Sequence, residues 1–180
     1  MKYREMAGEK ISVLGFGCMR FPTTSKNAED IDAEKSAKML EYAIENGVNY
    51  FDTAYVYHGG KSESFIGGVL KPYRDKIHIA TKCPTWEVKC EEDLDRLLNE
   101  QLERLQTDYI DFYLMHALDK DRFKNVVEKF NLIDKLNKAK ADGKIRHIGF
   151  RSMMTLKHLK RLLTQILIGS FVRYSLTILT

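Results

Sequence analysis

The stretch VNYFDTAYVYHGGKSESFIG, residues 48–67, starts as an apolar strand-like run and continues with the pattern of an amphipathic helix. The run Val48–Ala54 is short, apolar and rich in aromatic residues, as buried strands are. Phe65 and Ile66 begin an apolar stripe at helical spacing, and Ser62 is a residue type that caps helix N-termini. The stretch therefore predicts one buried β-strand followed by one α-helix.

Four other apolar runs have the same strand-like character: Ile11–Cys18, Ile77–Lys82, Tyr109–His116 and Ile145–Phe150. The starts of all the runs are about 30 to 37 residues apart, a spacing typical of repeated βα units around a parallel sheet. A closed (β/α)₈ barrel needs roughly 250 residues, whereas this chain has 180. We therefore predict an α/β fold, an incomplete (β/α)₈ TIM barrel of about five βα units followed by a tail.

The segments between the runs have helical periodicity. The clearest apolar face consists of Leu94, Leu97, Leu98, Leu102 and Leu105. Gly47 follows another predicted helix, at the position where a left-handed residue often ends a helix.

Composition excludes several classes of protein. The hydrophobic content of 44% suffices for one buried core. The sequence contains no run of eighteen or more apolar residues, so we predict no membrane span. The N-terminal sequence MKYREMAGEK is too polar for a secretory signal, which predicts a cytoplasmic protein. The three cysteines lack zinc-ligand spacing, so we predict reduced thiols and no metal site, with Cys83 as a buried structural thiol.

The net charge of +4 comes from the C-terminal part of the chain alone. Residues 151–180 contain five basic residues and no acidic one, which leaves 24 basic and 25 acidic residues in the first 150. The body of the chain therefore has no basic patch that predicts a nucleic-acid partner.

Four polar side chains lie at or just beyond the C-terminal ends of the predicted strands: Asp52, Tyr57, Lys82 and His116. In a βα barrel the side chains at this rim converge on one site. A free phenol has a pKa of about 10 and is a poor proton donor at neutral pH. An ammonium group beside it stabilises the phenolate, and a carboxylate can hold the ammonium. An imidazole can orient a carbonyl oxygen, so the set suits protonation of an alkoxide during hydride transfer.

Each of these residues also has a structural interpretation. Asp52 could cap a turn, Lys82 could be a surface lysine, Tyr57 is one of nine tyrosines, and His116 could be a core histidine. For any one of these residues considered alone, the structural interpretation is favoured. Four complementary groups at one rim together favour a catalytic site.

The motifs FDTAYVYHGGKSESFIG, IATK, DYIDFYLMH and GKIRHIGF resemble those of the aldo-keto reductases, in the same order and at similar spacing. The opening LGFGCMRFP resembles a bacterial and archaeal branch whose members often carry a C-terminal iron–sulfur segment. The resemblance covers residues 1–150. It implies a (β/α)₈ barrel that binds NADPH or NADH and reduces a small carbonyl substrate, an aldehyde or ketone, to an alcohol.

The resemblance also implies a role for each site residue. Tyr57 would be the proton donor, Lys82 and Asp52 its tuning pair, and His116 the group that orients the carbonyl. Met19 and Arg20, together with Asp52, would approach the cofactor. Trp86 would line the substrate pocket, although an exposed loop aromatic is an equally good interpretation.

The family pattern stops after Phe150, where Arg151 stands in the place of a serine that helps to hold the nicotinamide amide in relatives. We predict that residues 1–150 are the N-terminal part of the barrel and that residues 151–180 are a basic tail, the product of a frameshift. Loss of one base from a serine codon at position 151 would account for the change, because the bases needed for residues 151–180 can be reread in the restored frame as a string that resembles the family's next helix and strand.

Two functions remain open on the sequence. The first is an NAD(P)H-dependent carbonyl reductase. The alternative is a catalytically inactive barrel fragment, or a non-enzymatic binding or regulatory protein of the same ancestry. In relatives, the later strands carry the residue that stacks on nicotinamide and the loops that grip the phosphates. An incomplete barrel also exposes strand edges, which predicts self-association.

Overall fold

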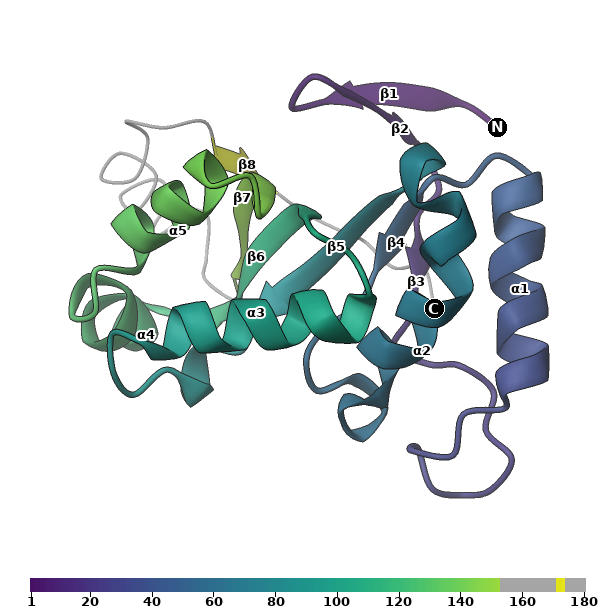
Figure 1. Cartoon of the computed structure of the whole chain (residues 1–180), viewed down its shortest axis with the longest axis horizontal. Coiled ribbons are helices and arrows are strands. Elements are labelled where there is room, and N and C mark those ends of the chain that lie inside the picture. The colour runs from purple at the N-terminus through teal and green to yellow at the C-terminus, as the bar shows by residue number, and fades with distance from the viewer. Residues whose placement is uncertain (153–170, 174–180) are drawn as a thin grey trace.

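The computed structural model of the chain describes residues 1–152 and 171–173. An antiparallel hairpin, β1 (Tyr3–Met6) and β2 (Glu9–Ser12), precedes a six-stranded sheet (Figure 1). The sheet contains β3 (Phe16–Gly17), β4 (Tyr50–Asp52), β5 (His78–Cys83), β6 (Ile110–Leu118), β7 (Ile145–Ser152) and β8 (Phe171–Arg173). Neighbouring strands are parallel and follow one another in chain order, as in a βα barrel. This confirms the predicted α/β fold and incomplete barrel.

Helical segments connect these strands. The α-helices are α1 (Ala33–Glu45), α2 (Lys61–Leu70), α3 (Asp93–Leu105), α4 (Lys120–Arg122) and α5 (Leu132–Ala141). The short 3₁₀ segments are η1 (Tyr57–Gly60), η2 (Lys71–Lys76) and η3 (Thr85–Glu87), and η4 (Phe123–Glu128) is a π-helical segment. No helix within the described residues is long and apolar enough to cross a membrane.

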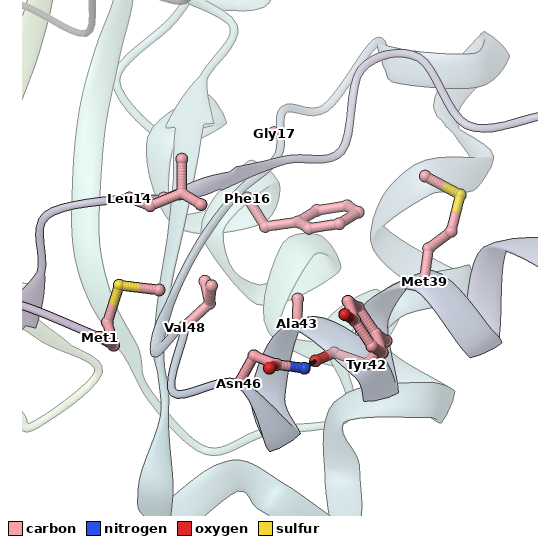
Figure 2. Close-up of a pocket in the computed structure, with 10 residues that line it drawn as sticks. Met1, Leu14, Phe16, Gly17, Met39, Tyr42, Ala43, Asn46 and Val48 are labelled. Carbon is pink, nitrogen blue, oxygen red and sulfur yellow. Dashed lines mark hydrogen bonds between the residues drawn. The ribbon is translucent and has the colours of Figure 1, made fainter.

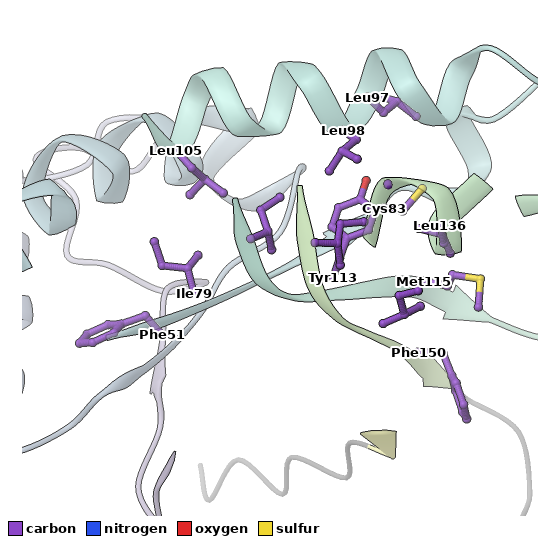
Figure 3. Close-up of a cluster of buried hydrophobic side chains, with 14 of the residues drawn as sticks. Phe51, Ile79, Cys83, Leu97, Leu98, Leu105, Tyr113, Met115, Leu136 and Phe150 are labelled. Atoms are coloured by element: carbon purple, nitrogen blue, oxygen red, sulfur yellow. The ribbon is translucent and has the colours of Figure 1, made fainter. Parts of the chain in front are cut away.

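The two faces of the sheet belong to different cores. Figure 3 shows leucines of α3 directed toward Ile79 and Tyr113 of the sheet, in the large core beneath the helices. A smaller core on the other face contains Phe112 together with Ile11 of the hairpin. Side chains alternate along β6 as far as Met115, where the register with β7 shifts, and the charge of Lys82 acts on His116, which agrees with a place for His116 on the same inner face as Phe112. The strands therefore present their polar end residues on the face that the helices do not cover.

The first predicted strand was wrong in extent. The run Ile11–Cys18 is divided between β2, which pairs with β1, and the two-residue β3, which pairs with β4. The Ser12 hydroxyl donates to the Leu14 carbonyl at 2.7 Å, and this local bond interrupts the run. Gly47 has φ of 85° just after α1, which confirms the predicted helix end.

The closest approach between α2 and α3 requires a glycine. A Cβ atom on Gly67 would lie 2.5 Å from the Arg104 carbonyl oxygen and 2.7 Å from the Leu105 carbonyl carbon. We expect Gly67→Ala to lower the free energy of unfolding by about 1–3 kcal/mol, because the two backbones must move apart. In the matched variant Gly68→Ala, the nearest atom to the new methyl group is 3.8 Å away. Removing this second helical glycine should raise the free energy of unfolding by about 0.5–1 kcal/mol. Urea unfolding of both variants checks the pair, and equal effects would contradict the packing argument.

Candidate active site

Lys82 is the centre of a buried polar cluster at the C-terminal ends of β4 and β5. Its Nζ lies 2.7 Å from Asp52 Oδ1, 2.6 Å from the Thr53 carbonyl oxygen and 3.4 Å from the Tyr57 hydroxyl oxygen. The lysine side chain is only 3% exposed and that of Asp52 12%. The structure therefore brings three of the four predicted residues into direct contact.

Strand register and one turn produce this arrangement. Asp52 is paired with Ala80 across the β4–β5 ladder, so Lys82 lies two residues further along the same face. The chain then turns sharply through His58 and Gly59, which have φ of 53° and 62°. Tyr57 precedes this turn and is half-buried. Its ring centroid lies 5.0 Å from Lys82 Nζ.

His116 lies on the inner face at the end of β6, but no hydrogen bond joins it to the Lys82 cluster within the described residues. Its backbone carbonyl accepts from the Thr85 hydroxyl at 2.8 Å. The neighbouring residue Trp86 is half-exposed, and its ring centroid lies 5.1 Å from that of His116. His116 Nδ1 is buried without a partner among the described residues, which leaves its hydrogen-bonding capacity unused.

The surroundings of His116 keep its imidazole neutral. Burial lowers the pKa of His116 from 6.5 to about 4, and the positive charges of Lys82, Arg151 and Arg122 act in the same direction. A neutral imidazole has one N–H donor and one free acceptor at neutral pH. This residue can therefore donate to a neutral or negatively charged oxygen without carrying a charge of its own.

This lowered pKa has a consequence for stability. Between pH 6.5 and about 4 the unfolded chain binds a proton at residue 116 that the folded chain does not bind. The free energy of unfolding contributed by His116 should therefore fall as the pH decreases through this window. Urea unfolding of the wild type and His116→Gln across the window isolates this contribution. The difference between the two proteins should change with pH, and parallel stability curves would contradict the assignment.

Met19 and Arg20 lie in the loop that follows β3. The Cys18 amide donates to the Asp52 carbonyl oxygen at 2.8 Å, so the loop leaves the sheet beside the Lys82 cluster. Both side chains are exposed, and Arg20 has no acidic partner within the part of the chain that the structure describes. The structure thus places these two residues at the same rim, without a side-chain contact to the cluster.

A second buried network supports Lys82 from the helix side. Gln101 of α3 donates to the Lys82 carbonyl oxygen at 3.1 Å and to Glu63 Oε1 at 2.5 Å, and it accepts from the Tyr113 hydroxyl at 2.8 Å. Burial raises the pKa of Glu63. Sequence reasoning missed these residues, although one signal was present: Gln101 interrupts the apolar face of a helix whose other members are leucines.

Two smaller expectations concern Ser62 and Cys83. The N-cap of α2 is Gly60 rather than Ser62, whose buried hydroxyl donates instead to the Cys18 carbonyl oxygen at 2.9 Å. Cys83 is a buried free thiol, as predicted, and burial raises its pKa to about 12. Among the described residues no cluster of histidine, cysteine or acidic side chains could hold a metal ion.

Comparison with known proteins shows the family of the chain. The model of the aldo/keto reductase family matches residues 13–174. The chain belongs to the aldo/keto reductase family. Members of this family are oxidoreductases. The matched range continues past Phe150, and the predicted division of the chain there stays a prediction that sequencing of the source DNA would test.

Individual members of the aldo/keto reductase family show how much of the barrel is matched. A probable aldo-keto reductase of Glycine max is 32% identical over 151 residues, which cover 79% of this chain and 42% of the relative. The aldo-keto reductase AKR11C1 of Bacillus halodurans, solved in its holo form, has a TM-score of 0.75 and 30% identity over 91% of this chain and 54% of its own. An aldo-keto reductase of Klebsiella pneumoniae solved with NADPH has a TM-score of 0.69 and 25% identity over 86% of this chain and 50% of its own. The chain spans about half the length of the curated relatives that it matches.

Proposed function

We propose that the protein is an NAD(P)H-dependent reductase that converts an aldehyde or ketone to an alcohol, with Tyr57 as the proton donor. The observation that carries this proposal is the position of Lys82, whose ammonium group contacts both Asp52 and the Tyr57 hydroxyl. An ammonium in contact with a phenol stabilises the phenolate form, so this arrangement suits a tyrosine that gives up its proton during a reaction.

The cluster assigns a distinct task to each residue. Asp52 and the Thr53 carbonyl hold the ammonium of Lys82 in place. As the substrate oxygen gains negative charge, Tyr57 transfers its proton to that oxygen, and Lys82 stabilises the phenolate that remains. The ammonium is already oriented, so little reorganisation accompanies the proton transfer.

His116 and Trp86 are proposed to define where the substrate oxygen lies. The neutral imidazole donates one N–H bond to the carbonyl oxygen, which orients the substrate toward Tyr57 and stabilises the developing charge. The indole ring beside it provides an apolar wall for the rest of a small carbonyl compound.

The residues of the rim fit a nicotinamide cofactor in part. Arg20 is an exposed guanidinium without an acidic partner among the described residues, which suits an anionic group. Met19, the residue before Arg20, has an exposed apolar side chain. Together with Asp52, it would contact the nicotinamide. The cofactor, when bound, supplies the hydride.

Titration of the protein with NADPH, followed by nicotinamide fluorescence, tests this proposal. We expect saturable binding that weakens about tenfold in Arg20→Ala, the effect of losing roughly one charge-assisted bond. Lys26→Ala is the control, because Lys26 is also an exposed cation of the same loop. Absence of saturable binding in the wild type would overturn the cofactor assignment.

We also propose that the protein self-associates, because one end of the described sheet is apolar and has no further strand beside it among the described residues. β3 is an end strand of the described sheet, and a groove of about 420 Å³ runs between it and α1 (Figure 2). Leu14 and Tyr42 on its walls are 62% and 68% exposed. Exposed apolar strand edges favour pairing with another chain. We assign a second copy of this chain as the occupant, because the described sheet ends in β3 on one side and in β8 on the other, and the strands of this sheet pair in parallel.

Light scattering coupled to size-exclusion chromatography tests the self-association. The mean mass should rise with protein concentration, and Leu14→Lys should shift the protein toward the monomer, because a lysine on an edge opposes pairing. Lys38→Ala on the outer side of α1 is the control. A monomer at every concentration would contradict the proposal.

A further inference from the structure

We propose that His58 is a positioning residue that clamps the loop between β3 and α1 to the turn that carries Tyr57. His58 follows Tyr57 directly and is only 7% exposed. Its imidazole contacts two separate points of the loop, at Phe21 and Ala28. The clamp holds Met19 and Arg20 at a fixed place relative to the Tyr57 hydroxyl.

The two hydrogen bonds of the ring determine its tautomer. The Phe21 backbone amide can only donate, and it lies 3.0 Å from His58 Nε2, so Nε2 is the acceptor. The Ala28 carbonyl can only accept, and it lies 2.5 Å from Nδ1, so Nδ1 carries the proton. A doubly protonated ring would place an N–H group against the Phe21 amide. The clamp therefore requires a neutral imidazole with its proton on Nδ1.

The backbone of His58 also indicates that its side chain has a specific role. Its φ of 53° lies in the left-handed region, which is costly for a residue with a Cβ atom. The next two residues, Gly59 and Gly60, also have positive φ and bear no side chain. A non-glycine residue held in this region persists where surrounding contacts over-determine it. The two imidazole bonds are such contacts.

The loop is anchored on both sides of Met19 and Arg20, and His58 supplies the anchor that follows them. Before them, Cys18 is bound through its amide to the Asp52 carbonyl and through its carbonyl to the Ser62 hydroxyl. After them, the Phe21 amide is bound to His58, and the Phe21 ring lies 5.6 Å from the imidazole and 5.1 Å from the Phe65 ring. All of these anchors belong to residues 52–65, the segment that contains Tyr57. The residues on either side of Met19 and Arg20 are thus bound to the segment that carries Tyr57.

The catalytic consequence of this clamp rests on the proposed function. If Met19 and Arg20 contact the cofactor, loosening His58 should weaken cofactor binding more than it slows the chemical step. The KM for NADPH should then rise about tenfold, the effect of one lost bond, while kcat changes less.

The clamp itself is tested without turnover. The only acceptor of the Phe21 amide among the described residues is His58 Nε2, so this loop amide should exchange slowly with solvent. His58→Gln places an acceptor near the ε position, whereas His58→Asn places its amide near the δ position and loses the bond to Phe21. We expect Phe21 exchange to accelerate about tenfold in His58→Asn and to stay within about threefold of wild type in His58→Gln. Asparagine tolerates a left-handed φ better than glutamine, so backbone strain predicts the opposite order.

Two further readouts make the test decisive. Nitrogen chemical shifts of the His58 ring should show the proton on Nδ1 in the wild type. Ser25→Ala removes two exposed hydrogen bonds elsewhere in the loop, the one that the hydroxyl donates to Asp30 and the one that it accepts from the Asn27 amide, and it should leave Phe21 exchange unchanged. Rapid Phe21 exchange in the wild type, a proton on Nε2, or equal exchange in the two His58 variants would overturn the clamp. None of these outcomes depends on whether the protein binds NADPH or reduces a carbonyl.

Discussion

Tyr57→Phe is expected to lower the rate of carbonyl reduction by about 100- to 10,000-fold, the range for loss of a positioned proton donor. The phenylalanine ring keeps the packing of the turn but has no proton to transfer, and Lys82 loses a contact at 3.4 Å. NADPH binding should stay within about twofold of wild type, because proton transfer is a transition-state interaction. Steady-state NADPH consumption with an aromatic aldehyde measures the first effect, and fluorescence titration the second.

Tyr55→Phe is the matched control for this result. Tyr55 lies two residues earlier, and its hydroxyl bonds to Glu100 on α3 rather than to Lys82. Its removal should leave the turnover rate within about threefold of wild type, since only a partly buried hydrogen bond is lost. Similar losses in the two variants would show that Tyr57 has no special part in the reaction.

Lys82→Met is expected to destabilise the fold and to abolish turnover together. The substitution leaves the Asp52 carboxylate buried without its cation, and breaking a buried pair on one side costs about 3–5 kcal/mol of unfolding free energy. Turnover is lost because nothing stabilises the phenolate of Tyr57. Urea unfolding and NADPH consumption measure the two effects.

A double variant separates these two effects. Asp52→Asn combined with Lys82→Met removes both charges, so part of the unfolding free energy should return. Turnover should not return, because the ammonium is still absent. Recovery of turnover in the double variant would argue that Lys82 acts only through stability. Retention of turnover in Lys82→Met alone would contradict its proposed role.

Strand periodicity explains why the placement of Asp52, Lys82 and His116 at one rim could be predicted from the sequence. Asp52 lies near the end of one apolar run and Lys82 ends the next, the two runs become neighbouring parallel strands, and parallel strands bring their C-terminal ends to one rim. His116 ends the next run and lies on the same inner face. These positions depend on a two-residue period and on chain order, which are both visible in the sequence.

The supporting contacts could not be predicted in the same way, because they depend on where loops return. His58 binds Phe21 and Ala28, which are 37 and 30 residues away in the chain. No periodic pattern connects these positions. Ser12 likewise ends the first predicted run through a hydrogen bond to Leu14, a local competition that apolar character does not reveal. Gln101 is the exception, since its polarity within a leucine face indicated a buried partner.

Transfer of deuterium from NADPH to product tests the central claim most directly. The wild-type protein should convert an aromatic aldehyde to an alcohol that carries deuterium on its carbinol carbon, when NADPH is labelled at the position that gives the hydride. Tyr57→Phe should give at most about one hundredth of that product in the same time. Absence of labelled alcohol from the wild type at saturating NADPH, or equal yields from the two proteins, would contradict the account.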